Sequence, residues 1–280
     1  MSTADCIRSV ILTSKEICNK YLVTPCSIET VSEVLKKKID EVDIIFVDFD
    51  GCLAPESEPY QLEVFKAILD KYTGITHDIN QVMADVTGNP IKDSYKLFRK
   101  KYGFDVAPKK ATKEHFKMYN QLVKDNKIVP HPVIVAALLH AKEQGKPIYI
   151  LSNANIKTVC PSVKRWTKQG LLPKNLFNAI FAYDSETRKK LPKAEFIKKF
   201  CPKNKIAAMF EDSLSTLEKM SVYGIRGFLF HSPSTPQEIT SSDKLNNYTV
   251  FDTPSVPMKE GWHKEWRSSG YFNRLINSAL

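Results

Sequence analysis

IIFVDFDGCL, at residues 44–53, is an apolar run that leads directly into two aspartates, a glycine and a turn. Four apolar residues without polar alternation are typical of a strand that is buried on both faces. Side chains alternate along a strand, so we expect Asp48 and Asp50 to point the same way and Phe49 to face the opposite packing layer. Two carboxylates on one side of a strand end repel each other, and a divalent cation with oxygen ligands relieves that repulsion.

The bulk composition is that of a soluble globular protein, with 280 residues, 42% hydrophobic and 26% charged. No apolar run approaches the roughly 20 residues needed to span a bilayer. Arg8, Lys15 and Glu16 interrupt the apolar residues near the N-terminus, so we expect no signal peptide there and a cytoplasmic location. The six cysteines are scattered without a C-x-x-C pair, so free thiols in a reducing compartment are expected.

The formal net charge is +10, which is compatible with an anionic substrate, nucleic acid or an acidic membrane surface as partner. The basic residues are dispersed along the chain, so a solvated basic surface is the favoured explanation. The sequence contains no recognisable nucleic-acid or membrane signal, and it gives no indication of the oligomeric state.

Strands alternate with helices along most of the chain, and this pattern predicts an α/β fold. Strands are expected at 44–47, 147–151, 176–182, 205–210 and 227–230, which implies a doubly wound, Rossmann-like parallel sheet with helices on both faces. An all-helical insert, with helices near 60–73, 91–102 and 112–124, interrupts the pattern. The predicted organisation is a helical N-terminal extension at 1–42, an α/β core at 43–57 and 128–230, a helical cap at 58–127, and a C-terminal extension of unassigned role at 231–280.

Polar side chains follow the strands of the predicted sheet at their carboxyl ends, where ligands bind in doubly wound folds. They are Asp48 and Asp50 after the first strand, Ser152 and Asn153 after the second, Lys190 and Lys193 after the third, and Glu211 and Asp212 after the fourth. Carboxylates, a hydroxyl and a lysine around one crevice suit magnesium-dependent phosphoryl transfer, because metal and cation share the charge of the transferring group.

Four motifs in order give the chain a resemblance to the haloacid dehalogenase-like phosphatase superfamily over about residues 43–230. They are Asp-Phe-Asp-Gly at 48–51, Leu-Ser-Asn at 151–153, a lysine-rich segment at 188–196, and Phe-Glu-Asp-Ser at 210–213. Segments 56–59 and 87–90 resemble the cap helices of the β-phosphoglucomutase and phosphoglycolate phosphatase group. The resemblance implies a core with an inserted helical cap, which closes over the site.

The resemblance also implies the roles of the four acidic residues. Asp48 is the expected nucleophile, which forms an aspartyl-phosphate. Asp50 is the expected general acid and base. Asp48, the backbone carbonyl of Asp50 and Asp212 are the expected ligands of Mg²⁺, with Glu211 as an accessory contact.

The remaining roles fall to a serine, a lysine and the substrate contacts. Ser152 is expected to hydrogen-bond a phosphoryl oxygen, and a lysine to neutralise the phosphoaspartate. Leu191 stands where the third motif has proline, which leaves two candidates: the spacing to Phe196 favours Lys190, and Lys193 is the alternative. The candidate substrate contacts are Gly51, Asn153 and Lys92.

Three functions are compatible with these residues. The first is a Mg²⁺-dependent phosphatase acting on a small phosphorylated metabolite. The second is a sugar phosphomutase of the β-phosphoglucomutase type, slightly disfavoured because the cap entry at 60–63 has no histidine. The third is a non-catalytic binding or effector protein on the same fold, motivated by the two extensions and the net charge.

Overall fold

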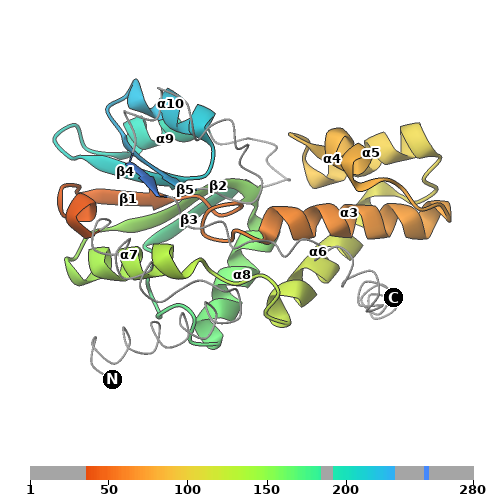
Figure 1. The fold of residues 1–280 in the computed structure, drawn as a ribbon, viewed down its shortest axis with the longest axis horizontal. Helices are drawn as coiled ribbons and strands as arrows, with labels where there is room; N and C mark the ends of the chain where they lie inside the picture. Colours follow the sequence, from red (N-terminus) through yellow and green to blue (C-terminus); the bar gives the residue numbers. More distant parts are fainter. Residues whose placement is uncertain (1–35, 184–191, 231–248, 252–280) are drawn as a thin grey trace. The chain divides into compact units, whose positions relative to one another are not determined.

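The computed structural model describes residues 36–183, 192–230 and 249–251 (Figure 1). The described residues form two compact units: Ser57–Ile128 is one, and the residues on either side of that segment form the other. Most of the N-terminal extension, the loop at 184–191 and most of the tail after residue 230 lie outside the described residues. The expectations for those segments stay predictions.

A six-stranded, all-parallel sheet is the centre of the first unit (Figure 1). The strands lie in the order β3-β2-β1-β4-β5-β6. Residue Ile45 pairs with Ile148, and Val47 pairs with Phe210, so β1 lies between β2 and β4. The strands are β1 (Ile44–Val47), β2 (Ile148–Asn155), β3 (Ala179–Tyr183), β4 (Ala207–Glu211), β5 (Arg226–Phe230) and β6 (Thr249–Phe251). This order confirms the predicted doubly wound α/β fold.

Helices cover both faces of the sheet, and the alternation of side chains along β1 explains why (Figure 1). Phe46 lies in one buried cluster with Ile197 and Leu217. Phe49 points to the opposite layer, where its ring stacks on Trp166 at a centroid distance of 5.5 Å. One face carries α7 (Pro132–Glu143) and α8 (Ile156–Lys168), and the other carries α9 (Lys193–Phe200) and α10 (Leu214–Ser221).

The second unit is entirely helical and packs around an aromatic core. Tyr95 and Phe104 stack at 5.7 Å, and the hydroxyl of Tyr95 lies 3.0 Å from Nδ1 of His115. Burial lowers the pKa of His115 to about 3, so its ring is neutral in this core. The helices are α3 (Ser57–Thr73), α4 (Ile79–Val86), α5 (Ile91–Tyr102) and α6 (Pro108–Lys124).

Some boundaries differ from those predicted. Helix α4 was not expected as a separate element, although Asp78 marks its start by accepting hydrogen bonds from the backbone N–H groups of Asn80 and Gln81. Strand β2 continues to Asn155 rather than ending near residue 151, and β6 pairs with β5 within a tail that had no assignment.

Two further expectations concern membranes and thiols. Among the described residues, no helix has the length and apolar character needed to cross a bilayer. Cys52, Cys160 and Cys201, the cysteines in the described part of the chain, are free thiols.

Substitution of Phe49 tests the packing under the acidic turn. Phe49→Ala should lower the free energy of unfolding by about 3–5 kcal/mol, because it removes a fully buried ring. Phe200→Ala is the matched control: Phe200 is 40% exposed, so the loss should be clearly smaller. Chemical denaturation measures both, and equal losses would contradict this account of the core.

Candidate active site

Asp48 directly follows β1, the strand that lies between β2 and β4 in the sheet. Its backbone N–H donates to the carbonyl of Phe210 at 2.9 Å, which continues the ladder one residue beyond the strand. The side chain is buried, with 6% of the residue exposed. Oδ2 lies 2.9 Å from Nζ of Lys193, whereas the buried Oδ1 has no hydrogen-bond partner among the described residues. A buried carboxylate oxygen without a donor is suited to binding a cation.

The turn after β1 is closed by backbone hydrogen bonds. The N–H of Leu53 donates to the carbonyl of Asp48 at 3.2 Å, and that of Ala54 donates to Phe49 at 2.7 Å. Gly51 has φ +72°, and a Cβ added there would lie 2.1 Å from Oδ2 of Asp212. Glycine is therefore required both by the backbone conformation and by the close approach of a carboxylate.

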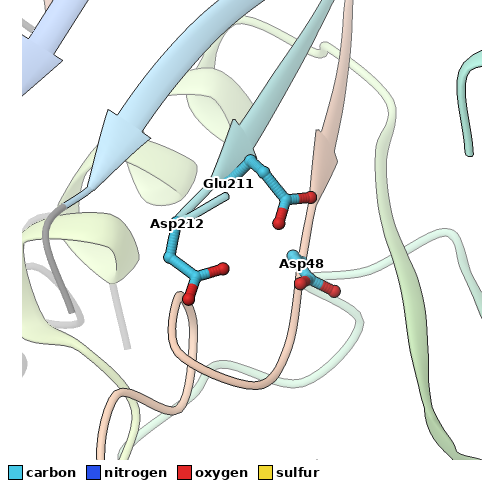
Figure 2. Close-up of side chains that lie close together, drawn as sticks. All are labelled: Asp48, Glu211 and Asp212. Carbon is cyan, nitrogen blue, oxygen red and sulfur yellow. The ribbon is translucent and has the colours of Figure 1, made fainter. Parts of the chain in front are cut away.

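Three carboxylates converge from the ends of β1 and β4 (Figure 2). One carboxylate oxygen each from Asp48, Glu211 and Asp212 can be chosen so that all three lie within 4.8 Å of one another. Such a set of oxygen ligands, with the orphaned Oδ1 of Asp48 among them, fits a hard divalent cation such as Mg²⁺.

Lys193 supplies the positive charge of this site. It is the first residue of α9, and its Nζ lies 2.9 Å from Oδ2 of Asp48 and 2.7 Å from Oε2 of Glu211. Burial alone lowers the pKa of Lys193, but the charges of Asp48 and Glu211 outweigh burial and raise it, so the ammonium form persists. Burial and the charge of Asp48 raise the pKa of Glu211, against the opposing effect of Lys193.

Ser152 and Asn153 belong to β2, at the same edge of the sheet. The register pairs Val47 with Ile150, so Ser152 lies beyond the end of β1. Ser152 is buried, and its hydroxyl oxygen accepts a hydrogen bond from the backbone N–H of Ala154 at 3.0 Å. Asn153 is exposed. Both residues therefore stand at the carboxyl edge expected for a phosphate contact.

For two of the predicted site residues the structure gives no contact with this group. Lys190 lies outside the described residues, so the expectation that favours it stays a prediction. Lys92 is exposed in the first turn of α5, within the helical unit. Lys193, the alternative candidate for the motif lysine, contacts Asp48.

Two features of the site were missed by sequence reasoning. Glu211 pairs with Lys193, and nothing in the local sequence joins these two residues. Cys52 follows the acidic pair directly, and its thiol is fully buried; burial and the charges of Asp48 and Asp212 raise its pKa well above the ordinary value. Its place next to the first motif was the only signal available for this neutral, buried thiol.

The chain thus has an α/β fold with an inserted helical unit, and its acidic cluster lies at the carboxyl edge of the sheet. This combination is typical of one class of α/β enzymes. A family model described as haloacid dehalogenase-like hydrolase matches residues 42–218. The chain belongs to the haloacid dehalogenase-like hydrolases. No curated protein sequence matches it significantly.

Solved structures share the fold at low sequence identity. A variant of CbbY from Rhodobacter sphaeroides, in complex with xylulose-(1,5)-bisphosphate, has a TM-score of 0.58 and 19% identity, with 77% of this chain and 95% of that chain covered. A family IA hydrolase from Entamoeba histolytica has a TM-score of 0.57 and 16% identity, covering 75% and 92%. A β-phosphoglucomutase from Clostridium difficile has a TM-score of 0.51 and 16% identity, covering 82% and 98%.

Substitution of Gly51 tests the close approach of Asp212. Gly51→Ala should weaken divalent-metal binding by about tenfold or more, because the added Cβ displaces a carboxylate of the cluster. Gly103→Ala is the matched control: its φ is +65°, but nothing lies within 4 Å of the added Cβ. That variant should lose about 1–2 kcal/mol of stability and keep its metal affinity. Titration calorimetry with Mn²⁺ compares the two, and equal affinities would contradict the prediction.

Proposed function

We propose that the protein is a Mg²⁺-dependent phosphatase that hydrolyses a small phosphorylated metabolite through an aspartyl-phosphate intermediate. The observation that carries the proposal is the environment of Asp48. One oxygen is held by the ammonium group of Lys193, and the other is buried beside two further carboxylates, with no donor in the part of the chain that the structure describes. A carboxylate held in this way has a fixed direction and needs no base to act as a nucleophile.

The chemistry divides between the two aspartates of the turn. Asp48 attacks phosphorus, the bond to the leaving oxygen breaks, and the phosphoryl group is transferred to a carboxylate oxygen of Asp48. Asp50 donates a proton to the leaving oxygen and then accepts one from the water that hydrolyses the intermediate. The same residue thus acts as acid in the first step and as base in the second.

The acidic cluster would hold Mg²⁺. Asp48, Asp212 and the backbone carbonyl of Asp50 are the proposed ligands, with Glu211 as an accessory contact. The ion supplies neutralisation of charge on the transferring phosphoryl group. Glu211 has a second role in this proposal, because it accepts a hydrogen bond from Lys193 and orients that ammonium group toward Asp48.

Substrate recognition is assigned to the carboxyl edge of the sheet. Ser152 donates its hydroxyl to a phosphoryl oxygen, with Asn153 and the backbone at Gly51 beside it. Lys92 stays a predicted substrate contact. The CbbY variant holds xylulose-(1,5)-bisphosphate, which supports a small phosphorylated compound as the class of substrate.

Substitutions in the acidic turn test the reaction. Asp48→Asn should lower turnover of p-nitrophenyl phosphate in the presence of Mg²⁺ by at least about 1,000-fold, because an amide is a poor nucleophile. Asp50→Asn should lower it by about 100-fold or more while a phosphorylated enzyme form accumulates, detected by mass spectrometry. Full turnover by Asp48→Asn would refute the mechanism. Release of an isomer rather than phosphate from a hexose 1-phosphate would indicate a phosphomutase.

A lysine exchange decides between the two candidates of the third motif. Lys193→Met should abolish turnover, because it removes the cation between Asp48 and Glu211 and leaves two buried carboxylates unpaired. Lys190→Met should retain most of the activity. Steady-state kinetics of both variants, with circular dichroism as a control for folding, measure the difference. The reverse ranking would identify Lys190 as the motif lysine.

A further inference from the structure

Strand β3 is the outermost strand on one side of the sheet. It pairs in parallel with β2, in regular register from Ala179 to Phe181. In the part of the chain that the structure describes, no strand pairs with the outer side of β3, and no backbone hydrogen bond joins that side to another segment. The strand reads Ala-Ile-Phe-Ala-Tyr at 179–183, without the charged residue or proline that commonly protects an edge strand from pairing.

Aromatic rings extend this edge on the face of the sheet that carries α9. Between ring centroids, Phe181 of β3 lies 4.7 Å from Phe196 and 5.4 Å from Phe200. Tyr149 of β2 lies 4.9 Å from Phe200, and it stacks on the fully buried ring of Phe46. The four rings other than Phe46 are only partly buried, and Phe200 is 40% exposed. A continuous, partly exposed aromatic surface therefore lies beside the edge strand.

The charge near this edge is positive and unbalanced. Residues 144–183 contain six basic residues and no acidic residue. Lys168 is exposed at the end of α8, which packs on the other face of β3, and Lys174 is exposed in the connection to β3. Neither lysine has an ion-pair partner among the described residues. Lys205, at the entry to β4, differs because it pairs with Asp43 at 3.0 Å.

The combination of an open edge, aromatic rings and lysines favours one kind of partner. A second copy of this chain would bring the same positive charge to the edge, and like charges across an interface repel each other. An extended peptide, by contrast, can join an exposed sheet edge through backbone hydrogen bonds, with alternate side chains on the two faces. Apolar side chains on the α9 face would cover the aromatic rings, and acidic side chains on the α8 face would meet the lysines.

We propose that the edge of β3 binds an extended segment of a partner protein, with alternating acidic and apolar residues, as an additional strand of the sheet. The apolar residues of this segment pack on Phe181 and Phe200, and its acidic residues face Lys168 and Lys174. The binding does not rest on the proposed phosphatase reaction, because β2 separates β3 from the strand that leads to Asp48.

A designed peptide tests the proposal on the full-length protein. The probe is a fluorescent peptide of four Glu-Val repeats, long enough to cover β3. Fluorescence anisotropy should give a dissociation constant in the micromolar range at low salt, weakened about fivefold or more at high salt. A peptide of four Lys-Val repeats, and a Glu-Val peptide N-methylated at alternate residues, should bind about tenfold more weakly. Equal binding of either control, or no binding of the probe at millimolar concentration, would overturn the proposal.

Matched variants locate the binding surface. Phe200→Glu puts a negative charge among the aromatic rings and should weaken probe binding about tenfold, whereas Tyr223→Glu changes an equally exposed ring beyond α10 and should have no effect. Lys168→Glu should weaken binding about fivefold, and Lys109→Glu makes the same change of charge on α6 without effect. Equal effects within the lysine pair would overturn the assignment to this edge, even where Phe200→Glu fails to fold.

Hydrogen exchange and sedimentation test the other possible occupants of the edge. By NMR, the outward amides of residues 179–183 should exchange rapidly in the free protein and become protected when the Glu-Val probe binds. Slow exchange of all these amides in the free protein would show that the edge is already covered, which would overturn the proposal. A dimer in sedimentation that Phe200→Glu dissociates would assign the edge to a second copy and would overturn it equally.

Discussion

An ammonium group buried between two carboxylates is the interaction on which the site depends. Nζ of Lys193 lies within 3 Å of oxygens on both Asp48 and Glu211, in surroundings where each charge alone would be strongly unfavourable. The cluster has three carboxylates and one ammonium group, so an excess of negative charge remains after this pairing. That excess explains why the oxygen of Asp48 that has no partner among the described residues suits a divalent cation. In the proposed reaction, the same excess would require added positive charge before a phosphoryl group could approach.

The topology of the sheet brings these charges together. Asp48 and Glu211 are far apart in the chain, yet β4 returns to pair with β1 after the chain has passed through β2 and β3. Their carboxyl ends then lie side by side at the point where the strand order reverses, as is usual for binding sites in this fold. Lys193 lies at the same edge of the sheet because α9 begins there. After α9 the chain enters β4, which returns to that edge at Glu211.

Sequence patterns predicted the architecture well because an apolar run and the polar residues that follow it are visible in a short stretch of sequence. The residues Asp48, Ser152 and Asp212 were placed at strand ends for this reason. The spacing of the third motif favours Lys190, which lies outside the described residues, and the contact of Lys193 with Asp48 depends on where α9 begins. The pairing of Lys193 with Glu211 is a tertiary contact, and no local pattern encodes it. Helix α4 was missed because its only start signal is the cap at Asp78.

The turn that carries Asp48 and Asp50 is held on several sides by interactions of different kinds. Phe49 anchors it to Trp166 by stacking, and Gly51 lets the Asp212 carboxylate approach its backbone. The third restraint is the hydrogen bond that the backbone N–H of His131 donates to the carbonyl of Leu53 at 2.8 Å, and Leu53 in turn donates its N–H to the carbonyl of Asp48. The turn that carries the two aspartates is therefore restrained by side-chain packing, by a close approach that glycine permits, and by main-chain hydrogen bonds.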